Sequence, residues 1–163
     1  MKVDLPAPDI FFGNDKMEVT DTDIYKSDQA FTQGQMITVT GIDNLNEWWI
    51  DPDFFEKQSD GALKFLPING DYRVTANAVL KYFSVMALKD GKPAKLQDDG
   101  TGAIWAIGKG IGKPSVASSE VGWEPGKALC LAQVAPKKYQ LTLKAGETLK
   151  TSGDWEAISF KFF

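Results

Sequence analysis

The stretch Thr101–Pro125 decides the fold prediction, and it reads T-G-A-I-W-A-I-G-K-G-I-G-K-P-S-V-A-S-S-E-V-G-W-E-P. It begins with a short apolar strand at Ala103–Ile107 and continues into a glycine-punctuated loop at Gly108–Pro114. Small and polar residues then lead to Gly122-Trp123. A strand that opens into a loop with lysines and ends on a tryptophan can present a flat, rimmed binding surface. The stretch therefore predicts both a β-fold and a candidate site.

Short strands separated by turns extend in both directions from this stretch. Apolar and polar residues alternate in Met36–Thr40 and in Lys138–Leu143. Asn69-Gly70 is a strong signal for a two-residue hairpin turn. Ala78–Leu88 also fits helical spacing, but its content of β-formers favours a strand. Strands at intervals of about 8–12 residues with turns between them indicate an all-β sandwich or barrel. We expect an immunoglobulin-like β-sandwich with little helix.

The length of 163 residues suits one domain or two small ones. Residues 1–33 are expected to form a leading segment and edge strands, and residues 34–163 the sandwich. A faint internal repeat relates Leu63–Thr75 to Leu129–Thr142, which predicts pseudo-repeats at about 34–96 and 97–163. The repeat leaves open whether these are halves of one sandwich or two packed units.

The composition excludes several function classes. The chain has no histidine, so Ser-His and Cys-His nucleophile pairs are absent. Its single cysteine, Cys130, lies in an apolar run, and neither a metal nor a cofactor is expected. A net charge of −4 and a single arginine, Arg73, argue against a nucleic-acid partner. No apolar run is long enough to span a membrane.

Two patterns resemble enzyme or ligand sites but have simpler explanations. The glycine-rich loop fails the phosphate-loop pattern, because Ile107 replaces its first glycine and Pro114 its hydroxyl residue. Paired carboxylates, which can act as glycosidase acid and base or bind calcium, occur at Asp21/Asp23, Asp51/Asp53 and Asp98/Asp99. Turn chemistry explains the same pairs and is favoured, since none has a supporting motif.

The five tryptophans are many for a chain of this size. Trp105 lies in an apolar strand and is expected in the core. Trp48 and Trp49 are adjacent, so on a strand they would point to opposite faces, and we expect Trp49 to be the exposed one. Trp123 and Trp155 lie among glycine, proline and polar residues. There a tryptophan can stack on a sugar ring or cap the open end of the sandwich, and both interpretations stay open.

Four motifs carry a family resemblance: A-I-W-A-I-G-K-G-I-G-K-P-S (103–115), G-W-E-P (122–125), K-K-Y-Q-L-T-L-K-A-G-E-T-L (137–149) and I-S-F-K-F-F (158–163). They resemble the carbohydrate-binding modules of SusE/SusF-like outer-surface glycan-binding lipoproteins of Bacteroides-type polysaccharide utilisation systems. The resemblance covers roughly residues 34–163. The chain departs from it in a longer, more glycine-rich loop after Gly108 and in its end at F-K-F-F.

The resemblance implies a carbohydrate-binding-module β-sandwich. Such a module binds a polysaccharide or oligosaccharide without catalysis, in support of glycan uptake. Carried onto this chain, the sugar-stacking aromatic falls on Trp123, with Lys109 and Lys113 as hydroxyl donors. Trp49 and Trp155 complete the candidate set.

The resemblance also implies an extracytoplasmic location on the outer-membrane surface, through an N-terminal lipid anchor absent from this chain. The expected partners are a glycan and the components of an outer-membrane glycan importer. The alternative is a structural or protein-interaction β-sandwich of a surface assembly that does not bind sugar.

Overall fold

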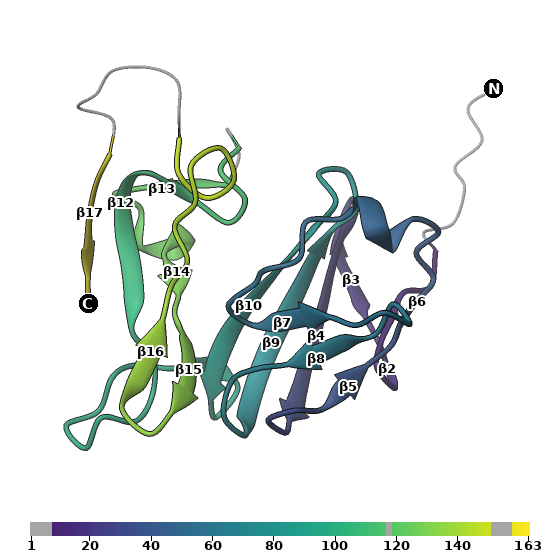
Figure 1. The fold of residues 1–163 in the computed structure, drawn as a ribbon, viewed down its shortest axis with the longest axis horizontal. Helices are drawn as coiled ribbons and strands as arrows, with labels where there is room; N and C mark the ends of the chain where they lie inside the picture. Colours follow the sequence, from purple (N-terminus) through teal and green to yellow (C-terminus); the bar gives the residue numbers. More distant parts are fainter. Residues whose placement is uncertain (1–7, 117–118, 151–157) are drawn as a thin grey trace.

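The structure is a computed structural model that describes residues 8–116, 119–150 and 158–163. Its largest element is a curled antiparallel sheet of five strands in the order β11-β10-β9-β4-β3 (Figure 1). The strands are β3 (Glu18–Asp21), β4 (Ile24–Phe31), β9 (Gly70–Asn77), β10 (Tyr82–Lys89) and β11 (Lys92–Pro93). Burial alternates along β9, where Tyr72, Val74 and Ala76 point into the core, as the sequence alternation predicts.

Two small sheets cover this large sheet. One has the order β5-β8-β7 and the other the order β2-β1-β6. Their strands are β1 (Phe11–Phe12), β2 (Asp15–Lys16), β5 (Met36–Ile37), β6 (Val39–Thr40), β7 (Phe55–Lys57) and β8 (Leu63–Phe65). The chain up to β11 is therefore a β-sandwich, and the predicted fold class is confirmed.

Aromatic rings fill the space between these sheets. Phe12 touches Phe31, Phe55 and Phe83 edge-on, with ring centroids 5.4–6.0 Å apart. Trp48 packs on Phe83 at 4.8 Å. Such rings bury much apolar area in favoured geometries, so they account for a large share of the stability of this half.

The second part of the chain is a smaller β-structure beside the first (Figure 1). Strand β12 (Trp105–Gly112) lies at its centre and pairs with three neighbours, β13 (Glu120–Gly122), β14 (Leu129–Cys130) and β17 (Ser159–Phe162). A hairpin of β15 (Ala132–Ala135) and β16 (Lys138–Gln140) completes it. Helical structure in the described residues is limited to two 3-10 turns, η1 (Leu45–Glu47) and η2 (Pro125–Lys127).

The two parts share a core. Ala103, Cys130 and Ala132 of the second part belong to the same buried cluster as the aromatic rings of the first. A separate small cluster around Ile107, Ile111, Val121 and Leu131 lies within the second part. The described segments include no helix that could cross a bilayer.

Some expected elements differ from the observed ones. Asn69-Gly70 does not close a hairpin, because β8 and β9 belong to different sheets and the pair lies in the crossover between them. Edge strands are expected within residues 1–33, but β4 in this range is interior, since it pairs with β3 and with β9. The strand predicted at Ala78–Leu88 is confirmed as a strand, although Ala78–Lys81 forms the turn before it.

Candidate functional site

Trp123 is an exposed candidate residue. It follows β13 and precedes the proline that starts η2, and 49% of its surface is exposed. Gly122 has a positive φ of 57°, a conformation that turns the chain out of the strand at low cost only for glycine. The outward position expected for Trp123 is therefore confirmed.

Lys109 is exposed on β12, where it pairs with Ser159 of β17. The preceding residue, Gly108, pairs with Gly122 of β13, and the register between β12 and β13 shifts after this pair. The expected loop at Gly108–Pro114 is in fact strand as far as Gly112, and only the last residues turn. The glycines serve close strand approach here: a Cβ on Gly108 would lie 2.1 Å from the carbonyl oxygen of Ser159 in β17.

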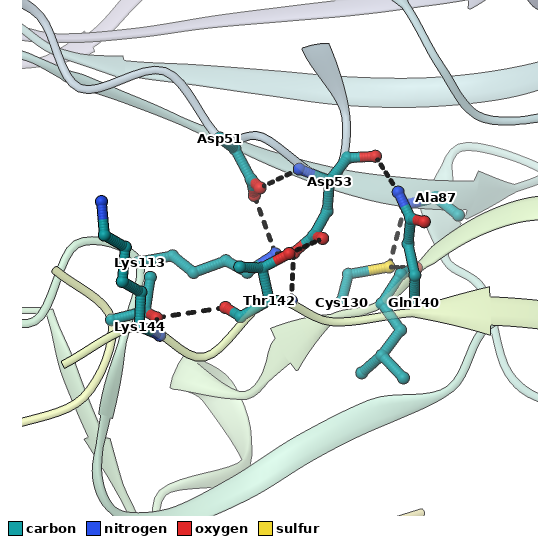
Figure 2. Close-up of polar contacts among 10 residues, drawn as sticks. Asp51, Asp53, Ala87, Lys113, Cys130, Gln140, Thr142 and Lys144 are labelled. Carbon is teal, nitrogen blue, oxygen red and sulfur yellow. Dashed lines mark hydrogen bonds and ion pairs between the residues drawn. The ribbon is translucent and has the colours of Figure 1, made fainter. Parts of the chain in front are cut away.

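Lys113 is not at the surface, which corrects its expected role as a sugar hydroxyl donor. Only 6% of the residue is exposed. Its Nζ lies 2.9 Å from Oδ2 of Asp51 and 2.8 Å from Oδ2 of Asp53 (Figure 2). The same Nζ stands 5.4 Å from the centre of the Phe54 ring. A buried ammonium held by two carboxylates is not presented to a ligand in solvent.

The two aspartates are themselves held firmly. The backbone N–H of Asp53 donates to Oδ1 of Asp51 at 2.9 Å. Asp53 accepts from the backbone N–H of Thr142 at 2.8 Å and from its hydroxyl at 2.7 Å. Residues from β16 and the following segment thus reach across to the loop before β7 (Figure 2). We call Asp51, Asp53, Lys113 and Thr142 the junction cluster.

The acid–base properties of the junction cluster are unequal. Burial raises the pKa of Asp51, and Lys113 offsets this only in part. Burial acts in the same direction on Asp53, but the charge of Lys113 and the hydrogen bonds from Lys113 and Thr142 outweigh it and lower its pKa. Burial acts to lower the pKa of Lys113, but the two carboxylates outweigh it and raise that pKa. The two carboxyls, two positions apart in sequence, are therefore electrostatically different groups.

Trp49 is half-buried and forms one wall of an open hollow of about 510 Å³. Its neighbour Trp48 is buried, so the expected division between the two rings is confirmed. Glu56, Lys57 and Glu147 also line the hollow. A hydrogen bond from Lys144 lowers the pKa of Glu147, which keeps this carboxylate charged. An aromatic face beside polar side chains is an arrangement that can hold a sugar ring.

The remaining candidates complete the set. Trp155 lies outside the described residues. Trp105, expected in the core, is half-buried, and its Nε1 donates to the carbonyl oxygen of Ala94 at 2.9 Å. An apolar groove of about 580 Å³ adjoins Trp105 and is lined by Met86, Leu96 and Phe163 among others. No cluster of metal-ligating side chains occurs among the residues that the structure describes.

Two family models match the chain. One, described as a domain of unknown function, DUF5125, matches residues 5–96, which is more than half of the chain. The chain belongs to the DUF5125 family. A second model, also described as a domain of unknown function, DUF5121, matches residues 99–163. The searches of curated proteins and of solved structures found no match.

We refer to residues 5–96 as the DUF5125 region and to residues 99–163 as the DUF5121 region. The junction cluster joins them, since Asp51 and Asp53 belong to the DUF5125 region and Lys113 and Thr142 to the DUF5121 region. The Trp49 hollow also spans both, because Glu147 comes from the DUF5121 region. Sequence reasoning identified the Asp51/Asp53 pair but missed its lysine, which has no local signal because the partners are about 60 residues apart.

Proposed function

We propose that the chain is a non-catalytic glycan-binding module. The observation that carries the proposal is the Trp49 hollow, in which an accessible indole stands beside the ionisable side chains Glu56, Lys57 and Glu147. Apolar faces of sugar rings stack on such indoles, and charged oxygens and amines fix the hydroxyl groups. Trp123 supplies a second exposed platform, and Lys109 is exposed on the adjoining strand β12. Two platforms suit a chain-like ligand, a polysaccharide or an oligosaccharide.

The sequence resemblance to SusE/SusF-like lipoproteins supports the same proposal and extends it. In this view the module works on the outer-membrane surface, anchored by lipid, and passes glycan to an importer. Immunodetection of the native full-length protein in fractionated cells tests the location. A purely cytoplasmic signal would contradict it.

The binding test is affinity electrophoresis in gels that contain soluble polysaccharides. Trp49→Ala and Trp123→Ala should each lose about 1–3 kcal/mol of binding free energy, the range measured for bases that stack on aromatic side chains. Phe162→Ala is the matched control, since Phe162 is an exposed aromatic residue, 54% accessible, on strand β17 and does not line the Trp49 hollow. Unretarded migration of the wild-type protein in every gel would defeat the proposal.

A protein-interaction module is the second candidate. It is favoured by the apolar groove at Trp105, whose lining includes the exposed side chains Leu96 and Phe163. Large exposed apolar surfaces often mark protein contacts. A reducing-sugar assay run beside the gels separates both candidates from an enzyme: released sugar would indicate a hydrolase, retardation without release a binding module, and neither result the interaction module.

A further inference from the structure

The junction cluster brings together an amine and two carboxyls with very little exposure to solvent. Side-chain exposure is 5% for Lys113, 2% for Asp51 and 1% for Asp53. Three charges, one positive and two negative, are thus buried together. Ion pairs of this kind are expensive to bury, because the lost hydration is repaid only when the geometry is excellent.

The geometry also suits a reaction between the amine and one carboxyl. Oδ2 of Asp51 lies 2.9 Å from Nζ of Lys113, so the carbonyl carbon next to this oxygen is within reach of the nitrogen. Oδ1 of Asp51 accepts the backbone N–H of Asp53 at 2.9 Å. This N–H is placed to stabilise negative charge on Oδ1 when the carbon becomes tetrahedral. Groups held in such contact react as though at very high concentration.

We propose that Lys113 and Asp51 condense to an intramolecular amide bond that covalently joins the DUF5125 and DUF5121 regions. The nitrogen of the neutral amine forms a bond to Cγ of the protonated carboxyl of Asp51. The bond from Cγ to Oδ2 breaks, and this oxygen leaves as water with one proton from the carboxyl and one from the amine. The reaction needs no oxidant, reductant or activating co-reactant. It replaces three buried charges by one, because only the carboxylate of Asp53 remains ionised.

Asp53 is the proton carrier in this proposal. Its Oδ2 lies 2.8 Å from the Lys113 nitrogen, so it can take a proton from the attacking amine and deliver it to the leaving oxygen. Thr142 fixes its position through two hydrogen bonds. The pKa directions agree with these roles. Burial raises the pKa of Asp51, the carboxyl that must be protonated, whereas the Lys113 and Thr142 contacts outweigh burial and lower the pKa of Asp53, the base.

The raised pKa of Lys113 means that the ammonium form predominates before reaction. The step therefore starts with transfer of a proton from Nζ to Asp51, over the 2.9 Å contact between them. This transfer turns an ion pair into a neutral amine and a neutral acid, and the burial of both side chains favours the neutral pair.

The experiment is the intact mass of the purified, folded protein after denaturation. The expected mass is lower than the sequence mass by one water molecule. Lys113→Met, Asp51→Ala and Asp53→Asn should each keep their full sequence mass. Lys81→Met is the matched control, since Lys81 makes an exposed ion pair with Glu47 at a similar distance of 2.8 Å; this variant should still lose one water molecule.

Peptide mapping makes the result specific. Dehydration of an Asp-Gly step such as Asp60-Gly61 also removes one water molecule, but it leaves a single linear peptide. The proposed bond instead gives one branched peptide that contains both Asp51 and Lys113, and it persists after mild alkaline treatment. This readout on the wild-type protein does not depend on the folding of any variant. A folded wild-type chain at full sequence mass, or a water loss located elsewhere, would overturn the proposal.

Discussion

Asp28 and Arg73 face each other across β4 and β9 and form a bidentate pair. Nε of Arg73 lies 2.8 Å from Oδ1 of Asp28, and Nη2 lies 2.9 Å from Oδ2. The hydrogen bond from Arg73 is the main cause of the lowered pKa of Asp28, with burial opposing it. The Asp28 side chain is 38% exposed, so solvent screens part of the interaction.

We expect Asp28→Asn to cost about 0.5 kcal/mol of unfolding free energy near neutral pH, within the usual range for exposed pairs. Because the folded-state pKa is lowered, the contribution of Asp28 should be complete above the ordinary value of 3.8. It should be lost as the pH falls through the lower, folded-state pKa. Urea unfolding of both proteins across the acidic range measures this, and a difference that grows on acidification would contradict it.

At the scale of single residues, the exposure of a side chain was easier to predict from the sequence than its interaction partners. The position of Trp123 between Gly122 and a following proline is a local property, so its exposure could be read from its neighbours. The fate of Lys113 depends on Asp51 and Asp53, which reach it only through the tertiary fold. A lysine among glycines is usually solvated, and nothing next to it in sequence indicated otherwise.

At the scale of elements, β17 depends on a glycine in its partner strand. A Cβ at position 108 would lie 2.1 Å from the Ser159 oxygen and 2.3 Å from Cα of Phe160, and the φ of Gly108 is +152°. Gly108→Ala should therefore push β17 away from β12. Backbone clashes of this kind add about 1–3 kcal/mol to the cost of the unfavourable φ.

Gly61→Ala is the control for that substitution. Gly61 also has a positive φ, +87°, but no atom lies within 4 Å of the added Cβ. Gly61→Ala should lower the free energy of unfolding by about 1–2 kcal/mol, because only the unfavourable φ of the alanine contributes. Amide hydrogen exchange is the readout: Gly108→Ala should speed exchange at the paired amides of Trp105 and Phe163, and Gly61→Ala should not. Equal exchange rates of these two amides in both variants would show that β17 does not depend on Gly108.

The strands that were predicted well from the sequence are those in which buried and exposed residues alternate. In β9 the buried residues recur at every second position, and this pattern is visible in the sequence. The hairpin predicted at Asn69-Gly70 was wrong because turn propensity predicts only that the chain bends there. It does not predict which strands pair after the bend. Here the bend carries the chain from one sheet to another. The second copy of the faint repeat includes the β15–β16 hairpin, whereas the first copy includes the crossover from β8 to β9.

At the scale of the whole molecule, the two regions are tied by more than the junction cluster. The N–H of Ile68 donates to the oxygen of Gln133 at 2.8 Å, and Gln33 donates to the oxygen of Val134 at 2.9 Å. The shared buried cluster crosses the same boundary. Each region would expose part of this core if the other unfolded alone.

We therefore expect a single unfolding transition. Denaturant curves followed by tryptophan fluorescence and by far-ultraviolet circular dichroism should coincide, as for a two-state domain. The fluorescence reports on Trp48 in the DUF5125 region and on Trp105 in the DUF5121 region, so both regions are observed. Two separate transitions would show that the regions fold independently.

The fold class followed from strand spacing and turn residues, which are local. The way in which the two regions share a core could not follow from them, because Ala103, Cys130 and Ala132 look like ordinary apolar residues of their own strands. Their place is decided by which surface each region leaves uncovered. Which surface stays uncovered depends on how the sheets assemble, and no periodic pattern of residues in the sequence encodes it.

Cys130 gives the boundary between the regions a chemical reporter. It is the single cysteine of the chain, it is 4% exposed, and its sulfur accepts the N–H of Ala87 from the DUF5125 region at 3.5 Å. Burial raises the pKa of the thiol to about 11, so the reactive thiolate is scarce while the regions stay together. Alkylation of Cys130 by a maleimide should therefore be slow in the intact chain, and its rate should rise under conditions that separate the two regions.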